Sequence, residues 1–277
     1  MGNPRRDIQS LSTDPDGRNP QLVNSVVRAF SILRCFERSR GHPEERYLGN
    51  QDIARRTRLP KATVSRLTQT LATLGYLEYA PAREKYALGP AVLGLGHAYM
   101  AGHDIVGIAQ PLMQELAEYT RAAVMLAVPD GLRMLLLEVC QGDETFNLRL
   151  EKGAHVPHGT TALGRADLAA RPRELFDLRM LDFERSTPPA DWPRIRAGIE
   201  RARQDYETYG FVFSMGDWHP DVFAVGVPMV SADRTRHFAF NISGRVSVMT
   251  REKLVQDFGP KLVALRNRVY EATEGRF

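Results

Sequence analysis

The chain has 277 residues, of which 43% are hydrophobic and 25% charged, enough for one large globular domain or two ordinary ones. No apolar run is long enough to cross a bilayer, and the N-terminal segment lacks the apolar stretch of a secretory signal. These features exclude a membrane-spanning protein and argue against a secreted one. The net charge is only +4, but residues 1–102 carry 15 Lys/Arg against 9 Asp/Glu (+6), whereas residues 103–277 carry 22 against 24 (−2). A basic N-terminal third predicts a polyanion-binding module attached to a near-neutral second part.

Two cysteines, Cys35 and Cys140, lie far apart in apolar surroundings. We expect buried free thiols in a cytoplasmic protein, with a redox switch as the alternative.

The first 21 residues are polar and contain Pro and Gly, so we expect a disordered tail. A winged helix-turn-helix is predicted over residues 22–88. Its first helix follows from apolar residues at helical spacing, namely Val23, Val26, Val27, Phe30 and Leu33.

The second helix is expected in "LGNQDIARRTR", with Asn50 as its cap and Asp52 in its first turn. The third runs from Pro60, which suits the first helical position, to Leu74 before Gly75. Two short β-like runs, "YLEY" and "KYALG", then predict a hairpin. Three helices followed by a hairpin are typical of a winged helix-turn-helix.

A linker helix is predicted over residues 89–103, where small residues would allow either a dimer contact or simple coverage of a core. The second domain is predicted over residues 104–277. It starts with a helix capped by Asp104 and continues with a strand pair around a Pro-Asp-Gly turn. A third strand is expected in "TFNLRLE", and a loop with helices is expected from about His155 to Tyr209. Three further strands and a closing helix complete an α+β domain.

The third helix carries two faces. Val64, Leu67, Leu71 and Leu74 share one side, and the polar set opposite is donor-rich and free of carboxylates. The residues of that opposite side are Lys61, Ala62, Ser65, Arg66 and Gln69. A merely solvated face is the alternative, but the third helix of a winged module usually reads the major groove.

The predicted DNA contacts divide by chemistry. Arg66 and Gln69 suit guanine and adenine edges, and the short side chain of Ser65 allows close approach. Positions near the helix start and in the preceding turn are expected at phosphates, and the wing cations Arg83 and Lys85 are expected at a flanking phosphate or in the minor groove. These phosphate-binding candidates are Arg55, Arg58, Lys61, Thr63, Arg83 and Lys85, with Arg56 beside them.

The chain resembles the IclR family of bacterial transcriptional regulators from Val23 onward. "NSVVRAFSILRCF", "LGNQDIARRTRLPKATVSRLTQTLATLGYLE" and "KYALGPAVLGLG" are similar to the opening helix, helix-turn-helix, and wing with linker of that family. "GAHVPHGTTALGRADLAA" and "GFVFS…VFAVGVPMV…FAFNISG" resemble its effector-binding part. The resemblance implies a winged DNA-binding domain joined by a linker helix to a GAF-like α/β effector domain. It also implies homodimers or homotetramers on palindromic or repeated DNA sites, with small organic acids as effectors.

In "PHGTTALGRADLAA" a loop enters a helix, so backbone N–H groups of Thr160, Thr161 and Ala162 can bind a carboxylate. The alternative is that the threonines only cap the helix. The chain departs from the family at several positions, with Ser214 where an acid is usual, Ala224 where many relatives have cysteine, Asn241 in place of serine, and Arg165 in place of lysine. Arg58 likewise stands where glycine is usual, so strain or a phosphate contact is expected there.

The predicted effector site adds polar and aromatic residues to this helix start. Asn241, Ser243 and Ser214 would hydrogen-bond a polar ligand, and Trp218 and Phe223 would frame a ring, with Ala224 beside them. We therefore expect a larger or aromatic acid rather than one of two or three carbons.

Three alternatives compete with a ligand-controlled regulator. His155, His158, His219, Asp217 and Asp221 suggest a metal cluster, but their spacing is loose and exposed loop histidines are preferred. Ser214, His219 and Asp217 contain triad chemistry without a G-x-S-x-G elbow, so a hydrolase is disfavoured. The absence of a P-loop or dinucleotide fingerprint implies no cofactor. The third alternative is a DNA-binding protein that ignores small molecules.

Overall fold

The computed structural model describes residues 23–38, 46–102, 105–142 and 150–277, and it divides into two compact units between Tyr99 and Met100. The predicted tail, the Asp104 cap and most of the strand predicted in "TFNLRLE" lie outside the described residues. None of the described helices is long and apolar enough to span a membrane.

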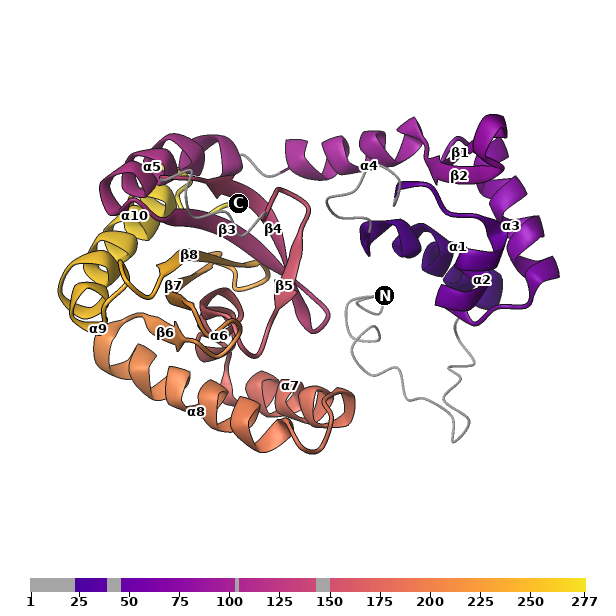
Figure 1. Ribbon diagram of the computed structural model, residues 1–277. Coiled ribbons are helices and arrows are strands. Elements are labelled where there is room, and N and C mark those ends of the chain that lie inside the picture. The colour runs from indigo at the N-terminus through magenta and orange to yellow at the C-terminus, as the bar shows by residue number, and fades with distance from the viewer. Residues whose placement is uncertain (1–22, 39–45, 103–104, 143–149) are drawn as a thin grey trace, which may run out of the picture. The chain divides into compact units, whose positions relative to one another are not determined.

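The N-terminal unit is a winged helix-turn-helix, as predicted (Figure 1). Its elements are α1 (Asn24–Arg34), a 3-10 turn (Cys35–Arg38), α2 (Asn50–Thr57), α3 (Lys61–Thr73), β1 (Leu77–Ala80), a 3-10 turn (Pro81–Arg83), β2 (Lys85–Leu88) and α4 (Pro90–Ala101). The strands β1 and β2 form the antiparallel wing. Ile32, Ile53, Val64 and Leu77 are almost completely buried and bring one residue from each of α1, α2, α3 and β1 into a common core.

Two predicted helix starts are shifted by one residue. Gly49, not Asn50, is the cap of α2, and its N–H donates to Asp52 Oδ2 at 3.3 Å. Asn50 is the first helical residue, and its side chain instead accepts from Thr68. Pro60 precedes α3 rather than opening it. Gly49 and Pro60 both have extended backbones, with ψ of 162° and 140°, so neither is helical and each directly precedes the first helical residue.

The predicted apolar stripe of α1 is real, but most of it faces outward. Val23, Val26, Val27 and Phe30 are exposed, and Ile32 is the buried residue of the helix. Similarly, no residue of the described helix α4 is buried. Both helices therefore present apolar side chains to solvent.

The C-terminal unit is built around one antiparallel six-stranded sheet with the order β5-β4-β3-β8-β7-β6. The strands are β3 (Ala123–Asp130), β4 (Arg133–Cys140), β5 (His155–Pro157), β6 (Val212–Met215), β7 (Val222–Val230) and β8 (His237–Arg245). The helical segments are α5 (Ile105–Thr120), α6 (Ala162–Ala169), α7 (Arg173–Ser186), α8 (Trp192–Tyr209), α9 (Arg251–Lys253), a π-helical turn (Leu254–Phe258) and α10 (Gly259–Ala272). This α+β architecture agrees with the predicted fold class.

Alternation along β3 separates two cores. Val124 and Leu126 pack with α5 and α10 on one face of the sheet, whereas Met125 and Ala127 belong to the core shared with α6. Figure 1 shows α5 and α10 on one side of the sheet and α6, α7 and α8 on the other. Because both faces are covered, the strands are apolar throughout, and period-two patterning is weak.

Two details of this unit differ from the sequence prediction. β5 occupies part of the segment predicted as loop, and it pairs with only three residues of β4. The buried side of α5 includes Ile105, Ala109, Met113 and Leu116, whereas Ile108 and Leu112, which helical spacing from Ile105 would place on the same side, are only partly buried. The three residues of β5 carry too little periodicity for that strand to be recognised from sequence.

Candidate functional site

Helix α3 is held by one face and presents the other to solvent. Val64, Thr68 and Leu71 are buried. The Thr68 hydroxyl donates to Asn50 Oδ1 at 3.2 Å, which ties α3 to the beginning of α2. These contacts fix the rotation of the helix about its axis, and therefore which residues face outward.

The outward face contains the predicted reading set. Lys61, Ser65, Arg66 and Gln69 are exposed, and Thr63 is only partly buried. The first turn has no acidic residue, and no side chain caps it. Its free N–H groups and the positive end of the helix dipole therefore favour an anion such as a phosphate.

The turn before α3 contains a strained arginine. Arg58 has φ 56° and ψ 24°, the left-handed conformation that favours glycine, and its side chain is exposed. Arg55 donates to Asp52 at 2.7 Å across one turn of α2 and remains largely exposed. Arg56 differs from both, because its guanidinium donates to the Cys35 carbonyl at 2.9 Å and thus braces the fold.

The wing carries the remaining predicted cations. The guanidinium of Arg83 lies over the Tyr47 ring, 4.7 Å from its centroid. Lys85 begins β2 and is half-buried. The predicted DNA contacts therefore lie on three segments of one unit: the α2–α3 region, α3 itself and the wing.

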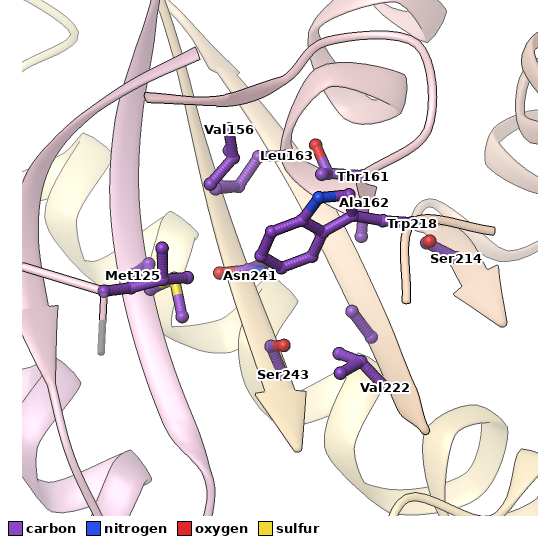
Figure 2. A pocket seen from close by; sticks show the side chains of 12 residues that line it. Met125, Val156, Thr161, Ala162, Leu163, Ser214, Trp218, Val222, Asn241 and Ser243 are labelled. Carbon is purple, nitrogen blue, oxygen red and sulfur yellow. The ribbon is translucent and has the colours of Figure 1, made fainter. Parts of the chain in front are cut away.

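A pocket lies in the C-terminal unit, between the sheet and the N-terminal end of α6 (Figure 2). Its free volume is about 20 Å³. It is lined by Met125, Leu150, Val156, Thr161, Ala162, Leu163, Ser214, Trp218, Val222, Ala224, Asn241 and Ser243. The lining is apolar along its walls and polar at two places, the α6 start with Ser214, and the β8 pair Asn241 and Ser243.

Of the predicted effector residues, only Thr160 and Phe223 do not line this pocket. The carbonyl of Thr160 accepts from the Ser214 hydroxyl at 2.7 Å. Phe223 packs instead against the core beneath α5 and α10. The sequence prediction missed the apolar wall, which consists of Met125, Leu150, Val156, Leu163 and Val222.

Strand register explains why these residues meet. Met125 pairs with Asn241 across β3 and β8, and Ala224 pairs with Ser243 across β7 and β8. Residues two apart share a face, so Asn241 and Ser243 both face the pocket. The "FNIS" alternation contained this signal, but the partner strand could not be identified without the register.

The start of α6 is pressed onto the sheet. A Cβ at Gly226 would collide with the Ala162 carbonyl, so only glycine permits this approach. The Thr161 hydroxyl accepts from Gly164 N at 3.3 Å and donates to the Pro157 carbonyl at 2.6 Å. Thr161 therefore caps α6, which does not decide whether the same helix start also binds a ligand. The N–H groups of Ala162 and Leu163 in the same turn still have no acceptor within the helix.

The pocket lining contains no charged side chain among the described residues. Asn241 is buried, and no donor among these residues reaches its Oδ1. An unpaired buried acceptor is costly, because it has given up water without a replacement. A ligand with a hydrogen-bond donor would satisfy it.

A buried ionic network lies at the other end of α6. Asp167 is fully buried and lies 2.8 Å from His158 Nε2 and 2.9 Å from Arg171 Nε, with His237 Nδ1 3.2 Å from its second oxygen. Burial acts to raise the Asp167 pKa, but hydrogen bonds from both histidines and the Arg171 charge outweigh it and hold the pKa far below its usual range. The expectation of exposed loop histidines is wrong for His158, which is fully buried, and for His155, which lies in β5 with a side chain only 9% exposed.

Among the described residues, the other histidines and the two cysteines form no recognisable reactive centre. His155 pairs with Asp130 at 2.8 Å, and His219 is exposed. Within the described residues, no group of three or more His, Cys, Asp or Glu is placed to hold a metal ion. Cys35 and Cys140 are buried and free, and burial raises the pKa of Cys140 to about 11, so its thiol stays protonated.

The triad alternative also lacks its geometry. The hydroxyl of Ser214 is directed to the Thr160 carbonyl, and the carboxylate of Asp217 accepts from Arg165 at 2.8 Å. Neither contact resembles the nucleophile–base–acid chain of a hydrolase.

Two family models match the chain. The IclR helix-turn-helix domain matches residues 25–81, and the bacterial transcriptional regulator IclR C-terminal model matches residues 97–269. The HTH-type transcriptional regulator TsaQ1/TsaQ2 of Comamonas testosteroni is 36% identical over 243 residues, covering 87% of this chain and 85% of its own.

Solved structures give the same result. An IclR family transcriptional regulator from Brucella abortus has a TM-score of 0.81 at 39% identity, with 95% of this chain and 97% of that chain covered. An IclR homologue from Microbacterium hydrocarbonoxydans, complexed with 4-hydroxybenzoate, has a TM-score of 0.67 at 20% identity, with 89% and 99% covered. The second likeness concerns the fold alone.

Proposed function

The chain belongs to the IclR family of bacterial transcriptional regulators, and from that premise we propose that a small aromatic acid, bound beside α6, controls its affinity for a palindromic operator. It is a DNA-binding transcriptional regulator and not an enzyme. The observation that carries the proposal is the pocket at the start of α6, in the unit that does not contain the helix-turn-helix.

The proposed operator contacts rest on the outward face of α3. Arg66 can donate two hydrogen bonds to a guanine, and Gln69 can pair with an adenine. Lys61 and the uncapped first turn of α3 would meet phosphates, together with Arg58. Phosphate contacts would supply most of the affinity, and the two long side chains would supply the sequence preference.

The chemistry of the pocket supports an aromatic acid. Free N–H groups at the α6 start can bind a carboxylate without a cationic side chain. The apolar wall and Trp218 suit a ring, and Asn241 with Ser243 can accept a donor at the far end of the ligand. A protein with the same fold holds 4-hydroxybenzoate, which has this combination of groups.

We further propose a homodimer, or a dimer of dimers, as the DNA-binding form. The exposed stripe of α1 and the exposed residues Leu93, Leu95 and Tyr99 of α4 are apolar surfaces that a second copy would cover. A two-fold dimer requires two matching half-sites, which makes the operator palindromic.

One observation favours the alternative of a regulator without an effector. The free volume of about 20 Å³ holds about one water molecule rather than an aromatic acid. If no ligand ever enters, the polar lining would be a packing feature only, and operator affinity would be constant.

Calorimetry separates these two possibilities. We expect benzoate or 4-hydroxybenzoate to bind with one site per chain, and Asn241→Leu, which removes the unpaired acceptor, to weaken that binding at least about tenfold. Tightest binding by glyoxylate would overturn the preference for a ring. Absence of heat with every acid would favour the effector-free alternative.

A further inference from the structure

Trp218 is the largest side chain lining the pocket. It belongs to the loop of residues 216–221, between β6 and β7, whereas most other lining residues lie on strands or α6. Figure 2 shows its indole ring among the other lining side chains, between the α6 start and the β8 residues Asn241 and Ser243. The indole therefore takes up space that a ring-containing ligand would need.

The remaining space is too small for such a ligand. A free volume of about 20 Å³ accommodates roughly one water molecule. The backbones of the strand residues are held by their ladders, with Met125 opposite Asn241 and Ala224 opposite Ser243. Trp218 lies in a loop and is only partly buried, so its side chain can move without breaking the sheet.

The loop is held in place beside Trp218 by an ion pair. Asp217 Oδ2 accepts from Arg165 Nη1 at 2.8 Å and from Met215 N at 3.2 Å. Gly216 N donates to the Val222 carbonyl at 3.0 Å, and the φ of +80° at Gly216 allows the chain to turn directly before Asp217. The loop is thus closed at its base by the Gly216–Val222 hydrogen bond and held next to Trp218 by the side chain of Asp217.

Arg165 is a rigid anchor for this ion pair. It is only 4% exposed, and its guanidinium also donates to the carbonyls of Phe213 at 3.0 Å and Gly159 at 3.3 Å. Burial acts to raise the Asp217 pKa, but the Arg165 hydrogen bond and charge outweigh this and hold it below its usual range. The ion pair is therefore intact at neutral pH.

We propose that Trp218 is the gate of the effector pocket, and that Asp217 and Arg165 are positioning residues that keep the gate closed in the absence of ligand. Arg165 belongs to α6, so the helix whose first turn would receive the carboxylate also holds the gate. The role of the gate in ligand entry rests on the proposed function. The position of Trp218 and its dependence on Asp217 do not.

A closed gate has a kinetic and an equilibrium consequence. When the binding-competent state is a minor population, the apparent affinity falls by that fraction. Weakening the Asp217–Arg165 ion pair should therefore speed ligand association and tighten the apparent binding of the ligand. General damage to the pocket would instead weaken ligand binding.

Tryptophan fluorescence tests the proposal without a ligand. The chain has two tryptophans, so Trp192→Phe leaves Trp218 as the sole emitter. We expect acrylamide to quench Trp218 weakly in this variant and several-fold more strongly after Asp217→Asn. Asp221→Asn makes the same charge change at an exposed position of the same loop and should leave quenching unchanged. Quenching like that of free tryptophan in the Trp192→Phe protein, or equal quenching in the two Asn variants, would overturn the proposal.

A second variant and a ligand arm complete the test. Arg165→Lys keeps the charge, but the lysine side chain is too short to reach both Phe213 and Asp217. It should therefore also increase the quenching of Trp218, and it replaces Asp217→Asn in the test if that variant does not fold. In stopped-flow mixing with 4-hydroxybenzoate, Asp217→Asn should associate about tenfold faster than the Asp221→Asn control. Equal or slower association would overturn the gate. Absence of acid binding in every variant, with the quenching difference intact, would overturn the proposed effector and leave the closed position of Trp218 supported.

Discussion

Arg66 carries a long, donor-rich side chain at the centre of the outward face of α3, where it is exposed. Its backbone carbonyl accepts from the Thr70 hydroxyl at 2.9 Å. A bidentate contact to guanine would make it a specificity residue. We expect Arg66→Ala to weaken operator binding by about 1–3 kcal/mol and to relax the preference at one base position. Fluorescence anisotropy on operator and single-base variants measures both effects.

The matched control for Arg66 is Arg196→Ala. Arg196 is exposed on α8 of the other unit, where it pairs with Glu200 at 2.9 Å. Both substitutions remove one positive charge, so a purely non-specific effect would be similar in the two proteins. Wild-type affinity and selectivity in Arg66→Ala would rule out its assigned role.

Arg58 combines backbone strain with an exposed charge. A non-glycine residue in the left-handed conformation destabilises the folded protein by roughly 1–2 kcal/mol. Glycine removes this strain, but it also raises the conformational entropy of the unfolded chain, which cancels part of the gain in stability. We expect Arg58→Gly to raise the free energy of unfolding by up to about 1 kcal/mol, measured by urea denaturation. We also expect weaker DNA binding, with the slope of log K against log salt reduced by about 0.9, as for one lost phosphate contact.

Arg58→Lys is the control for this substitution. It keeps both the charge and the left-handed strain, so stability and salt dependence should stay near those of the wild type. If Arg58→Gly bound DNA with the affinity and salt dependence of the wild type, Arg58 would make no phosphate contact.

Asp167 is the charged residue on which the interior of the C-terminal unit depends most. Asp167→Asn leaves Arg171 without its carboxylate, and removing one partner of a buried pair costs about 3–5 kcal/mol. The pKa of Asp167 is lower in the folded than in the unfolded protein, so its contribution is present above the unfolded pKa of about 4 and is lost as the pH falls below it. Urea denaturation at pH 7, 5 and 3 should show a stability difference between wild type and Asp167→Asn that shrinks only at pH 3. A difference that is absent at pH 7 would contradict this account.

At the residue scale, most polar residues of the pocket were predictable, whereas its aliphatic wall was not. Thr161, Asn241 and Ser243 stand out because a polar residue in an apolar run needs a reason. Met125 does not, since a methionine inside a strand is ordinary core. Its place in the pocket depends on the register with Asn241, which a single sequence does not contain.

At the scale of elements, α1 and α4 offer the clearest test of assembly. Phe30 is 57% exposed on α1. If a second copy covers this position, a charged residue there would be buried without a partner, which is costly. We expect Phe30→Glu to give the monomer mass in light scattering coupled to gel filtration, and to lose operator affinity because only one half-site is engaged.

Leu178→Glu is the control for this substitution. Leu178 is also 57% exposed, on α7 of the C-terminal unit, so it introduces the same charge at a similar apolar position. It should leave the dimer intact. Dissociation by Leu178→Glu but not by Phe30→Glu would place the contact elsewhere.

Element types were more predictable from sequence than the exposure of their faces. The helices of the winged unit follow from apolar spacing, but the same spacing on α1 suggested a stripe without indicating that it faces solvent. Apolar spacing indicates that a helix has an apolar face. It does not indicate whether that face packs on the core of the same chain or on another molecule. β5 was missed for the opposite reason, because three residues carry too little pattern.

At the scale of the whole molecule, one unit carries the helix-turn-helix and the other carries the pocket. An acid acts on operator affinity only if it binds the two DNA-affinity states of the protein differently. The uneven charge of the chain already separated these roles, with +6 in residues 1–102 and −2 in the remainder (15 − 9 and 22 − 24). The closed pocket, however, could not be predicted, since it depends on how Trp218, Asp217 and Arg165 pack.

Operator affinity measured with and without acid shows most directly whether the pocket controls DNA binding. An operator is first selected by the purified protein from a random DNA pool, and its Kd is then measured by anisotropy with saturating 4-hydroxybenzoate, benzoate or no acid. We predict a change of about 5- to 150-fold with at least one aromatic acid, and its loss in Asn241→Leu, which keeps its acid-free affinity. The same Kd under all three conditions, with acid binding verified by calorimetry, would contradict control of DNA binding through this pocket.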